Sequence, residues 1–482
     1  MASHGFDRPE SPAAQPRRAW LMWLSAAGVI LLICLCSLYF GWRFRASNRL
    51  DQLLASYRAA GQPTTLADLQ HPPIAEDQNA GLLYINAGAA VQNRKKKPFL
   101  DDLCGNVPFC RQNAEALAEL IANNAQPLAS LRRGRSLESC DFGVQFTSPA
   151  IDLQFPHLSQ IRTLAKLGSV SAIQAHISGD DSAAFDSTLD LFALSRAART
   201  DSHTMIQYLI GVAIESLACR AIESIQSPLA AAGTGSQPDS GQLRALIQIL
   251  LAEDDMRATY HHAMLGERAF VLDYMMVVIE SPEKMGAPAA SPFSALIKPA
   301  LLADVVHGQE LITQVAGMAE FTNVEQTRKK YPEQPSNDTL AGLQSTLSSM
   351  LIPSYLRSVE LYYRALAERR MAACALAIRL YEREHGQLPA TLTELVPQYL
   401  PAVPLDPMAA DNRPISYHPD GEAPILYSVG DNGRDDGGHE HERGKDSGPD
   451  DHAFYLHGNR PPPPFDPSEP SEEDDQTTDE HS

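Results

Sequence analysis

An acidic, glycine-rich stretch near the C-terminus has the composition of a calcium-binding loop. Residues 431–438 read DNGRDDGG, and two further aspartates follow at Asp450 and Asp451. Calcium takes about six to eight oxygen ligands, and glycines let the chain bend around the ion. An EF-hand does not fit, because Asp436 occupies the position of that motif's glycine and no helices flank the loop. The alternative is a solvated acidic connection, since residues 439–447 insert a charged stretch.

No established catalytic motif accompanies this loop. The sequence contains no GxSxG, HExxH or Walker motif, and no GxGxxG between a strand and a helix. His261 and His262 are adjacent, so on a helix their side chains point about 100° apart and cannot share a metal as an i, i+4 pair can. We interpret them as core or surface histidines. An enzyme whose active site is assembled from distant residues stays open as an alternative.

The loop follows elements that are typical of a helix packed on a small antiparallel sheet. The helix carries an apolar stripe of Met371, Cys374, Ile378 and Tyr381, and Gly386 marks its end. Further on, the sequence predicts a short helix that starts with the capping-box pattern at 391–394, and strands at 414–418, 424–429 and 452–457.

This part of the chain resembles the soluble domain of the major pseudopilin of type II secretion. The resemblance covers residues 370–456 and is carried by RMAACALAIRLYEREHGQLPATLTELVPQYLPAVPLDP, by ISYHP and by LYSVGDNGRDDGG. It implies a helix with a Gly-x-x-Pro exit, a short second helix, a small sheet and a calcium loop. Carried over position by position, it implies a carbonyl ligand from Ser428 and carboxylate ligands from Asp431, Asp436 and Asp451.

The whole chain also resembles uncharacterised membrane-anchored helical bacterial proteins, in part through the segment DQNAGLLY at 77–84. It departs from pseudopilins in two respects. A long helical region separates its apolar N-terminal run from the pseudopilin-like module, and the pseudopilin processing site is missing. The resemblance therefore implies nothing about assembly into a fibre.

Residues 19–42, AWLMWLSAAGVILLICLCSLYFGW, form an uncharged run long enough to span a membrane. A spanning helix needs about 20 mainly apolar residues. Trp20, Trp23 and Trp42 are the only tryptophans of the chain, and they lie near the two ends of the run, as interfacial rings do. A cleaved signal peptide would have a shorter apolar stretch followed by small residues. We therefore expect a retained single-pass anchor in the cell membrane.

Orientation is not decided by the positive-inside rule, because three arginines precede the run and three follow it closely. The short N-terminal tail is typical of a signal-anchor, which predicts that the bulk of the chain lies outside the cytoplasm. In that compartment Cys104 and Cys110 are expected to form a disulfide around a short loop.

Between the span and the module, the sequence predicts helices joined by short loops, which make neighbouring helices antiparallel. The expected helices are 48–60, 79–92, 114–124, 157–176, 182–196 and 204–225, then one long or broken helix over 243–280, and two or three helices over 300–318 and 339–385. The expected fold class is mainly α, with an N-terminal transmembrane helix, an irregular antiparallel helical array and a small C-terminal α+β module. The expected divisions are a disordered tail (1–18), the anchor (19–42), a helical region (46–226), a linker (227–241), a second helical region (242–369), the pseudopilin-like module (370–458) and a disordered acidic tail (459–482).

Charge and composition leave two functional classes. A net charge of −20 argues against nucleic acid, whose binding depends on phosphate neutralisation. We expect a membrane-anchored, non-catalytic scaffold or interaction protein of the cell envelope, with a calcium-stabilised C-terminal module. We expect protein partners in the envelope, and a secretion system is one candidate among them. The alternative is an envelope enzyme with its active site between the helices. Carboxylates or histidines that converge in a concave site would favour the enzyme.

Overall fold

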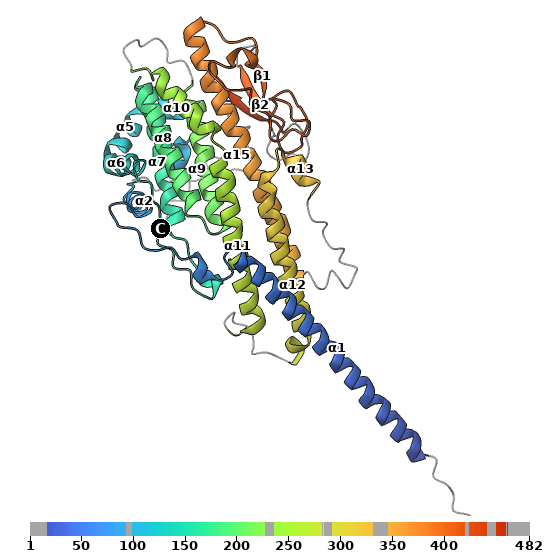
Figure 1. Ribbon diagram of the computed structural model, residues 1–482. Coiled ribbons are helices and arrows are strands. Elements are labelled where there is room, and N and C mark those ends of the chain that lie inside the picture. Colours follow the sequence, from blue (N-terminus) through green and yellow to red (C-terminus); the bar gives the residue numbers. More distant parts are fainter. Residues whose placement is uncertain are drawn as a thin grey trace, which may run out of the picture.

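The computed structural model describes residues 17–92, 99–226, 236–281, 283, 292–330, 346–419, 424–440, 450–458 and 460. The expected tails at 1–18 and 459–482 and the expected linker at 227–241 lie largely outside the described residues. Within them, the protein is mainly α-helical, with a long apolar N-terminal helix and a small antiparallel sheet near the C-terminus (Figure 1).

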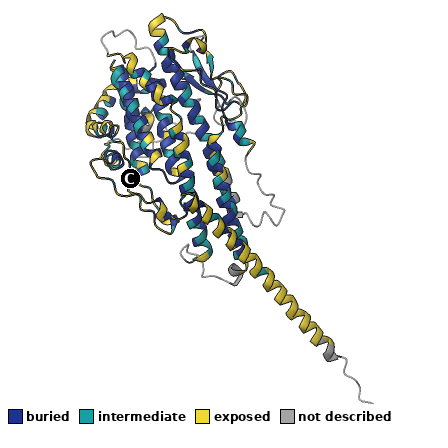
Figure 2. Cartoon of the chain, in the orientation of Figure 1, coloured by how far each residue is buried: buried dark blue, intermediate teal, exposed yellow. Residues whose placement is uncertain are grey.

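The helix α1 (Arg17–Ala59) projects from one end of the helical body (Figure 1). Its apolar side chains, among them Trp23, Leu31 and Leu38, are exposed along the projecting part, which Figure 2 shows in yellow. This helix is long and apolar enough to cross a membrane, as either an anchor or a signal sequence would be. The helix α9 (Met205–Ser224) is also long and apolar enough, but most of it is buried inside the body.

The last turns of α1 belong to the folded body. Leu50 and Tyr57 are buried, and the Tyr57 hydroxyl lies 3.0 Å from the Thr313 hydroxyl on α12 (Pro292–Ala316). The Arg268 guanidinium stacks over the Tyr57 ring, 3.5 Å from its centroid. The expected span and the expected helix after it therefore form one continuous helix whose end is packed into the core.

The body is built from helices of unequal length that pack around two large hydrophobic clusters and two smaller ones. The first helices are α2 (Ala80–Ala89), α3 (Phe99–Leu103), α4 (Val107–Gln112), α5 (Ala114–Asn123), α6 (Ala125–Gly134), α7 (His157–Ile177) and α8 (Asp181–Thr200). After α9 come α10 (Ser240–Leu251), α11 (Asp254–Glu280), α12, α13 (Val324–Arg328) and α15 (Thr346–His385). Short 3-10 helices lie at Leu66–Leu69, Ala150–Asp152, Gly317–Glu320 and Leu392–Leu395.

The long helix α15 contributes to both large clusters. Its N-terminal half contributes Val359 and Tyr363 to a cluster with α1, α11 and α12. Its C-terminal half contributes Cys374 and Ile378 to a cluster with α7–α10 and the sheet. One helix thus runs through the expected boundary at 369/370, and the C-terminal sheet shares its core with the helical body.

The sheet has the order β1-β2-β3, with both pairs antiparallel. Its strands are β1 (Ser416–His418), β2 (Ile425–Ser428) and β3 (His452–Tyr455). In the register, Leu426 lies opposite Tyr417 on one side and Phe454 on the other. Leu426 and Phe454 are buried in the same cluster as α15, so this short sheet is stabilised by packing on a helix. The expected capping box at Thr391 and Glu394 is confirmed.

The expected disulfide is not formed in the structure. The buried Cys110 Sγ lies 3.3 Å from the Leu103 carbonyl, and Cys104 Sγ lies 3.7 Å from the Lys166 carbonyl. Each thiol therefore faces a backbone oxygen instead of the other thiol.

Candidate functional site

Asp431 is one of the four calcium ligands expected from the resemblance. In the structure, its carboxylate faces arginines. Its Oδ2 accepts hydrogen bonds from Arg357 at 3.0 Å and from Arg364 at 2.5 Å, both on α15. Arg328 of α13 donates to the Asp431 backbone oxygen at 2.8 Å. Burial alone would raise the pKa of Asp431, but the nearby His452 ring, the charge of Arg364 and the hydrogen bond from Arg357 outweigh it and hold the pKa well below its ordinary value.

Asp436 and Asp451 are brought together by backbone hydrogen bonds. Asp451 Oδ2 accepts from the N–H of Asp436 at 3.0 Å and of Gly438 at 2.7 Å, and Asp436 Oδ2 accepts from the N–H of Asp450 at 3.1 Å. Asp451 Oδ1 is buried and has no hydrogen-bond partner among the described residues. Burial raises the pKa of Asp451 to about 6, against the lowering effect of the two N–H groups.

Ser428 lies at the end of β2, and its hydroxyl donates to the buried Asp406 at 2.7 Å. The four predicted ligands thus fall into a pair, Asp436 and Asp451, and two separate residues. Asp431 has its Oδ2 engaged by arginines, and Ser428 is expected to contribute its backbone carbonyl. The arginines that meet Asp431 lie 74 and 67 residues away in sequence, so no local pattern could reveal them. Calcium binding by this loop stays a prediction.

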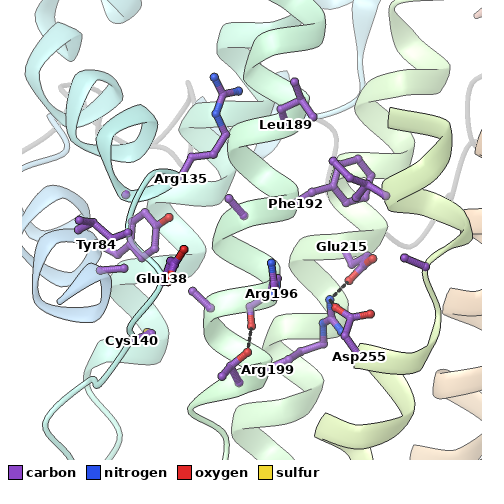
Figure 3. A pocket seen from close by; sticks show the side chains of 18 of the residues that line it. Tyr84, Arg135, Glu138, Cys140, Leu189, Phe192, Arg196, Arg199, Glu215 and Asp255 are labelled. Carbon is purple, nitrogen blue, oxygen red and sulfur yellow. Dashed lines mark hydrogen bonds and ion pairs between the residues drawn. The ribbon is translucent and has the colours of Figure 1, made fainter. Parts of the chain in front are cut away.

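A cavity of about 900 Å³ opens between the helices of the body. Its walls come from α2, from the end of α6 and the chain that follows it, from α8, α9 and α15, and from the end of α10 and the start of α11 (Figure 3). Leu189, Phe192, Arg196 and Arg199 recur along one face of α8 and all line it. With Tyr84 of α2, the first two give the cavity an apolar wall. The two arginines belong to a charged part that also contains the acidic residues Glu138, Glu215, Asp254 and Asp255.

Beside the cavity, the carboxylate of Glu215 on α9 is buried between two arginines. Arg199 Nη2 lies 2.9 Å from Glu215 Oε2, Arg369 of α15 pairs with Oε1, and the Ser195 hydroxyl donates to Oε2 at 2.8 Å. Burial alone would raise the pKa of Glu215, but the charges of Arg199 and Arg369 outweigh it and lower the pKa. Glu215 is therefore an ionised structural partner.

Arg369 is fully engaged with its neighbours. Besides Glu215, it donates to the backbone carbonyls of Ile249, Leu250 and Ala252 at the C-terminal end of α10. These contacts cap α10, since carbonyls at a helix end need donors. The helix expected over 243–280, either long or broken, is thus broken between α10 and α11.

Arg199 differs from Arg369, because one of its nitrogens has no acceptor. The Arg199 side chain is 2 % exposed, and its Nη1 atom is buried without a hydrogen-bond partner among the described residues. A Cβ at Gly211 of α9 would lie only 2.5 Å from Arg199 Cγ, so the glycine lets this side chain lie against α9. Arg196, one turn earlier on α8, is exposed in the cavity lining.

A second group of side chains converges on another part of the body. His71 Nε2 lies 2.7 Å from His203 Nε2, and Asp201 Oδ1 lies 3.7 and 3.8 Å from these two nitrogens. Burial and the neighbouring His262 and His71 lower the pKa of His203 to about 3. Burial raises the pKa of Asp201 to about 7, although the Phe142 N–H bonds to it.

The two adjacent histidines of α11 face different neighbours, as expected for their spacing. His262 Nε2 lies 3.2 Å from His203 Nδ1, whereas His261 Nδ1 lies 3.4 Å from the Ala316 carbonyl. No motif in the sequence marks the group of His71, Asp201 and His203. Asp201 and His203 are close in sequence, but His71 lies 132 residues from His203 and is brought there by the fold.

Comparison with known protein families, with curated proteins and with solved structures finds no match for this chain.

Proposed function

We propose that this chain is a membrane-anchored interaction protein of the cell envelope that binds a small anionic ligand in the cavity between its helices. The observation that carries the proposal is the buried Arg199 Nη1, which has no acceptor among the described residues and belongs to a side chain that lines the cavity. A buried donor left without a partner costs about 1–3 kcal/mol, and more when it is charged. A ligand that carries an oxyanion would supply the missing acceptor.

The remainder of the cavity fits an anion with an apolar part. Its volume of about 900 Å³ is within the range of small-molecule sites. Arg196 adds a second positive charge one helical turn from Arg199, and Tyr84, Leu189 and Phe192 offer apolar surface. An arginine pair at one end of an apolar wall favours a small carboxylate or phosphate with a hydrophobic body.

The ion pairs of Glu215, which lines the cavity, favour ligand binding over catalysis. Its buried carboxylate, Glu215, is held by Arg199 and Arg369 and is therefore unsuited to act as a general base. The alternative, an envelope enzyme, is favoured by a different observation, the convergence of His71, Asp201 and His203. None of these three residues lines the cavity.

A retained anchor is supported by the continuity of α1, which runs without a break from the apolar run into the folded body. Removal of a signal sequence up to about Trp42 would leave the buried Leu50 and Tyr57 in place but would cut a continuous helix. We place the body outside the cytoplasm, where envelope partners are accessible to it. Protease added to intact spheroplasts should then degrade the body. If the body is fully protected until the spheroplasts are lysed, this orientation is contradicted.

Native mass spectrometry of the full chain, purified in mild detergent from its own membranes, tests the proposed ligand. We expect a bound small molecule on the wild-type chain and its loss from Arg196→Gln. Arg162→Gln is the matched control, because Arg162 is an exposed arginine of α7 that does not line the cavity. The proposal fails if the wild-type chain carries no ligand, or if both variants retain it equally.

A further inference from the structure

We propose that His71, Asp201 and His203 bind one zinc ion. Their ligand atoms, Nε2 of both histidines and Oδ1 of the aspartate, lie within 4.8 Å of one another. Two imidazoles and one carboxylate are a ligand set that zinc uses when one coordination position is left for water or substrate. The site is separate from the ligand cavity, and the inference does not depend on the proposed function.

The three distances are close to those that zinc requires. Ligand atoms about 2.0–2.1 Å from a tetrahedral zinc ion are about 3.3 Å from one another. Here the separations are 2.7, 3.7 and 3.8 Å, which lie on both sides of that value. Small side-chain rotations would equalise them, because His71 is on a loop and its side chain is 43 % exposed. The same exposure leaves the outer side of the site open to a fourth ligand.

The fold holds the two inner ligands firmly. Asp201 and His203 lie in the turn that joins α8 to α9, and both are buried. At Gly266 of α11, a Cβ would lie 2.1 Å from the His203 carbonyl oxygen, so only glycine allows α11 to pack so closely on this turn. Phe146 packs edge-on against the His203 ring from another side, with the ring centroids 5.1 Å apart.

Neighbouring groups orient both inner ligands, as is common around metal ions. His203 Nδ1 faces His262 Nε2 at 3.2 Å, so the nitrogen that faces away from the site has a hydrogen-bond partner of its own. Asp201 Oδ2 accepts the Phe142 N–H at 2.8 Å, which leaves Oδ1 directed toward the two imidazoles. Each ligand atom is thus presented to the site while the second polar atom of the same side chain is occupied.

A proton shared between His71 and His203 is the competing explanation of their 2.7 Å contact. A hydrogen bond accounts for the pair of nitrogens but not for Asp201 Oδ1, which lies beyond hydrogen-bond distance from both. A cation near the centre of the three atoms accounts for all of them. Imidazole ligands favour zinc over calcium, which prefers oxygen.

Zinc titration of the full chain tests this inference. The chain is purified in detergent through an affinity tag without histidines, stripped with a chelator and titrated with Zn²⁺ by calorimetry, with metal analysis of the product. We expect one zinc per chain in this site, and at least a tenfold increase in Kd in both His71→Ala and Asp201→Asn. Asp201→Asn keeps an oxygen for the Phe142 N–H, so the turn should stay folded.

His385→Ala serves as the control, because His385 is an exposed histidine that stacks on Tyr381, far from this group in sequence. It should bind zinc as the wild type does. The inference is overturned if the wild-type chain binds no zinc, or if either His71→Ala or Asp201→Asn binds it with unchanged affinity. Because neither residue lines the cavity, these results are independent of ligand binding next to Arg199.

Discussion

Glu215 in the helical body and Asp431 in the C-terminal loop are each held by two arginines, and in both cases α15 supplies at least one of them. The Glu215 side chain is 1 % exposed, whereas the Asp431 side chain is 22 % exposed. The interaction of a fully buried ion pair cannot be replaced by water, so loss of one member leaves an uncompensated charge. At a partly exposed pair, water and ions take over much of the interaction.

The comparison separates two roles for similar chemistry. In the body, the pairs of Glu215 fix α8, α9 and α15 around the cavity, and Arg199 is left with a nitrogen for a ligand. In the loop, Arg357 and Arg364 neutralise Asp431 and attach the loop to the outside of α15. The first arrangement should control global stability and binding, and the second should control only the local order of the C-terminal region.

Glu215→Gln should give the largest loss of folding stability. The substitution keeps the shape of the side chain but leaves Arg369 buried without its counter-charge and Arg199 with Asp255 alone, at 3.4 Å. Loss of one member of such a buried pair costs about 3–5 kcal/mol. The denaturant midpoint of the detergent-solubilised chain, followed by helical circular dichroism, measures it. A loss no larger than that of Asp431→Asn would remove the distinction between the two regions.

Gly211→Ala should have the next largest effect. Its Cβ would lie 2.5 Å from Arg199 Cγ, so Arg199 must move, and overpacking of this kind costs about 1–3 kcal/mol. The same movement should weaken ligand binding. Gly317→Ala is the control, since a Cβ there meets no atom within 4 Å and should change stability by less than about 0.5 kcal/mol. Equal effects of the two substitutions would argue against tight packing at Arg199.

Asp431→Asn should cost about 1 kcal/mol or less near neutral pH. The pKa of Asp431 is lowered in the folded chain, so its stabilisation is present above the unfolded-state pKa of about 3.8 and is lost as pH falls below it. The difference in denaturant midpoint between wild type and variant should therefore shrink below about pH 4. A difference that grows on acidification would contradict the assigned ion pairs.

Calcium should have the smallest effect on stability, because Arg357 and Arg364 already neutralise the charge of Asp431. Hydrogen exchange of residues 425–440 and 450–456 should be slower with calcium than with a chelator, and the body should exchange equally in both. Asp451→Asn should abolish the difference, since Asp451 Oδ1 is buried without a hydrogen-bond partner among the described residues and Asp451 lies beside Asp436. Identical exchange of wild type in both conditions would leave the loop as a solvated acidic connection.

Local features of the sequence were enough to predict many elements. Gly386 has a φ of +74° just beyond the end of α15, which is the conformation expected of a glycine at a helix C-terminus. The uncharged run with tryptophans near its ends predicted the exposed part of α1, and the capping box at Thr391 predicted the start of the short helix at Leu392. Each of these signals involves residues within a few positions of one another.

The candidate sites depend on contacts that have no such signal. Glu215 and Arg369 are 154 residues apart, and His71 and His203 are 132 residues apart. Their residue types are ordinary for a chain of this length, and only the packing of α8, α9 and α15 and of the loop at His71 brings them together. For the same reason, the sequence could suggest carboxylates for calcium but could not show that Asp431 faces arginines.

The most direct measurement is an experimental structure of the full chain purified from its own membranes, at a resolution that distinguishes a water from a small molecule. The account predicts density for an anionic group within about 2.7–3.0 Å of Arg199 Nη1, continued by density along Tyr84, Leu189 and Phe192. A single water at Nη1, or a protein acceptor bonded to it, with the rest of the cavity filled by solvent, would contradict ligand binding at this site.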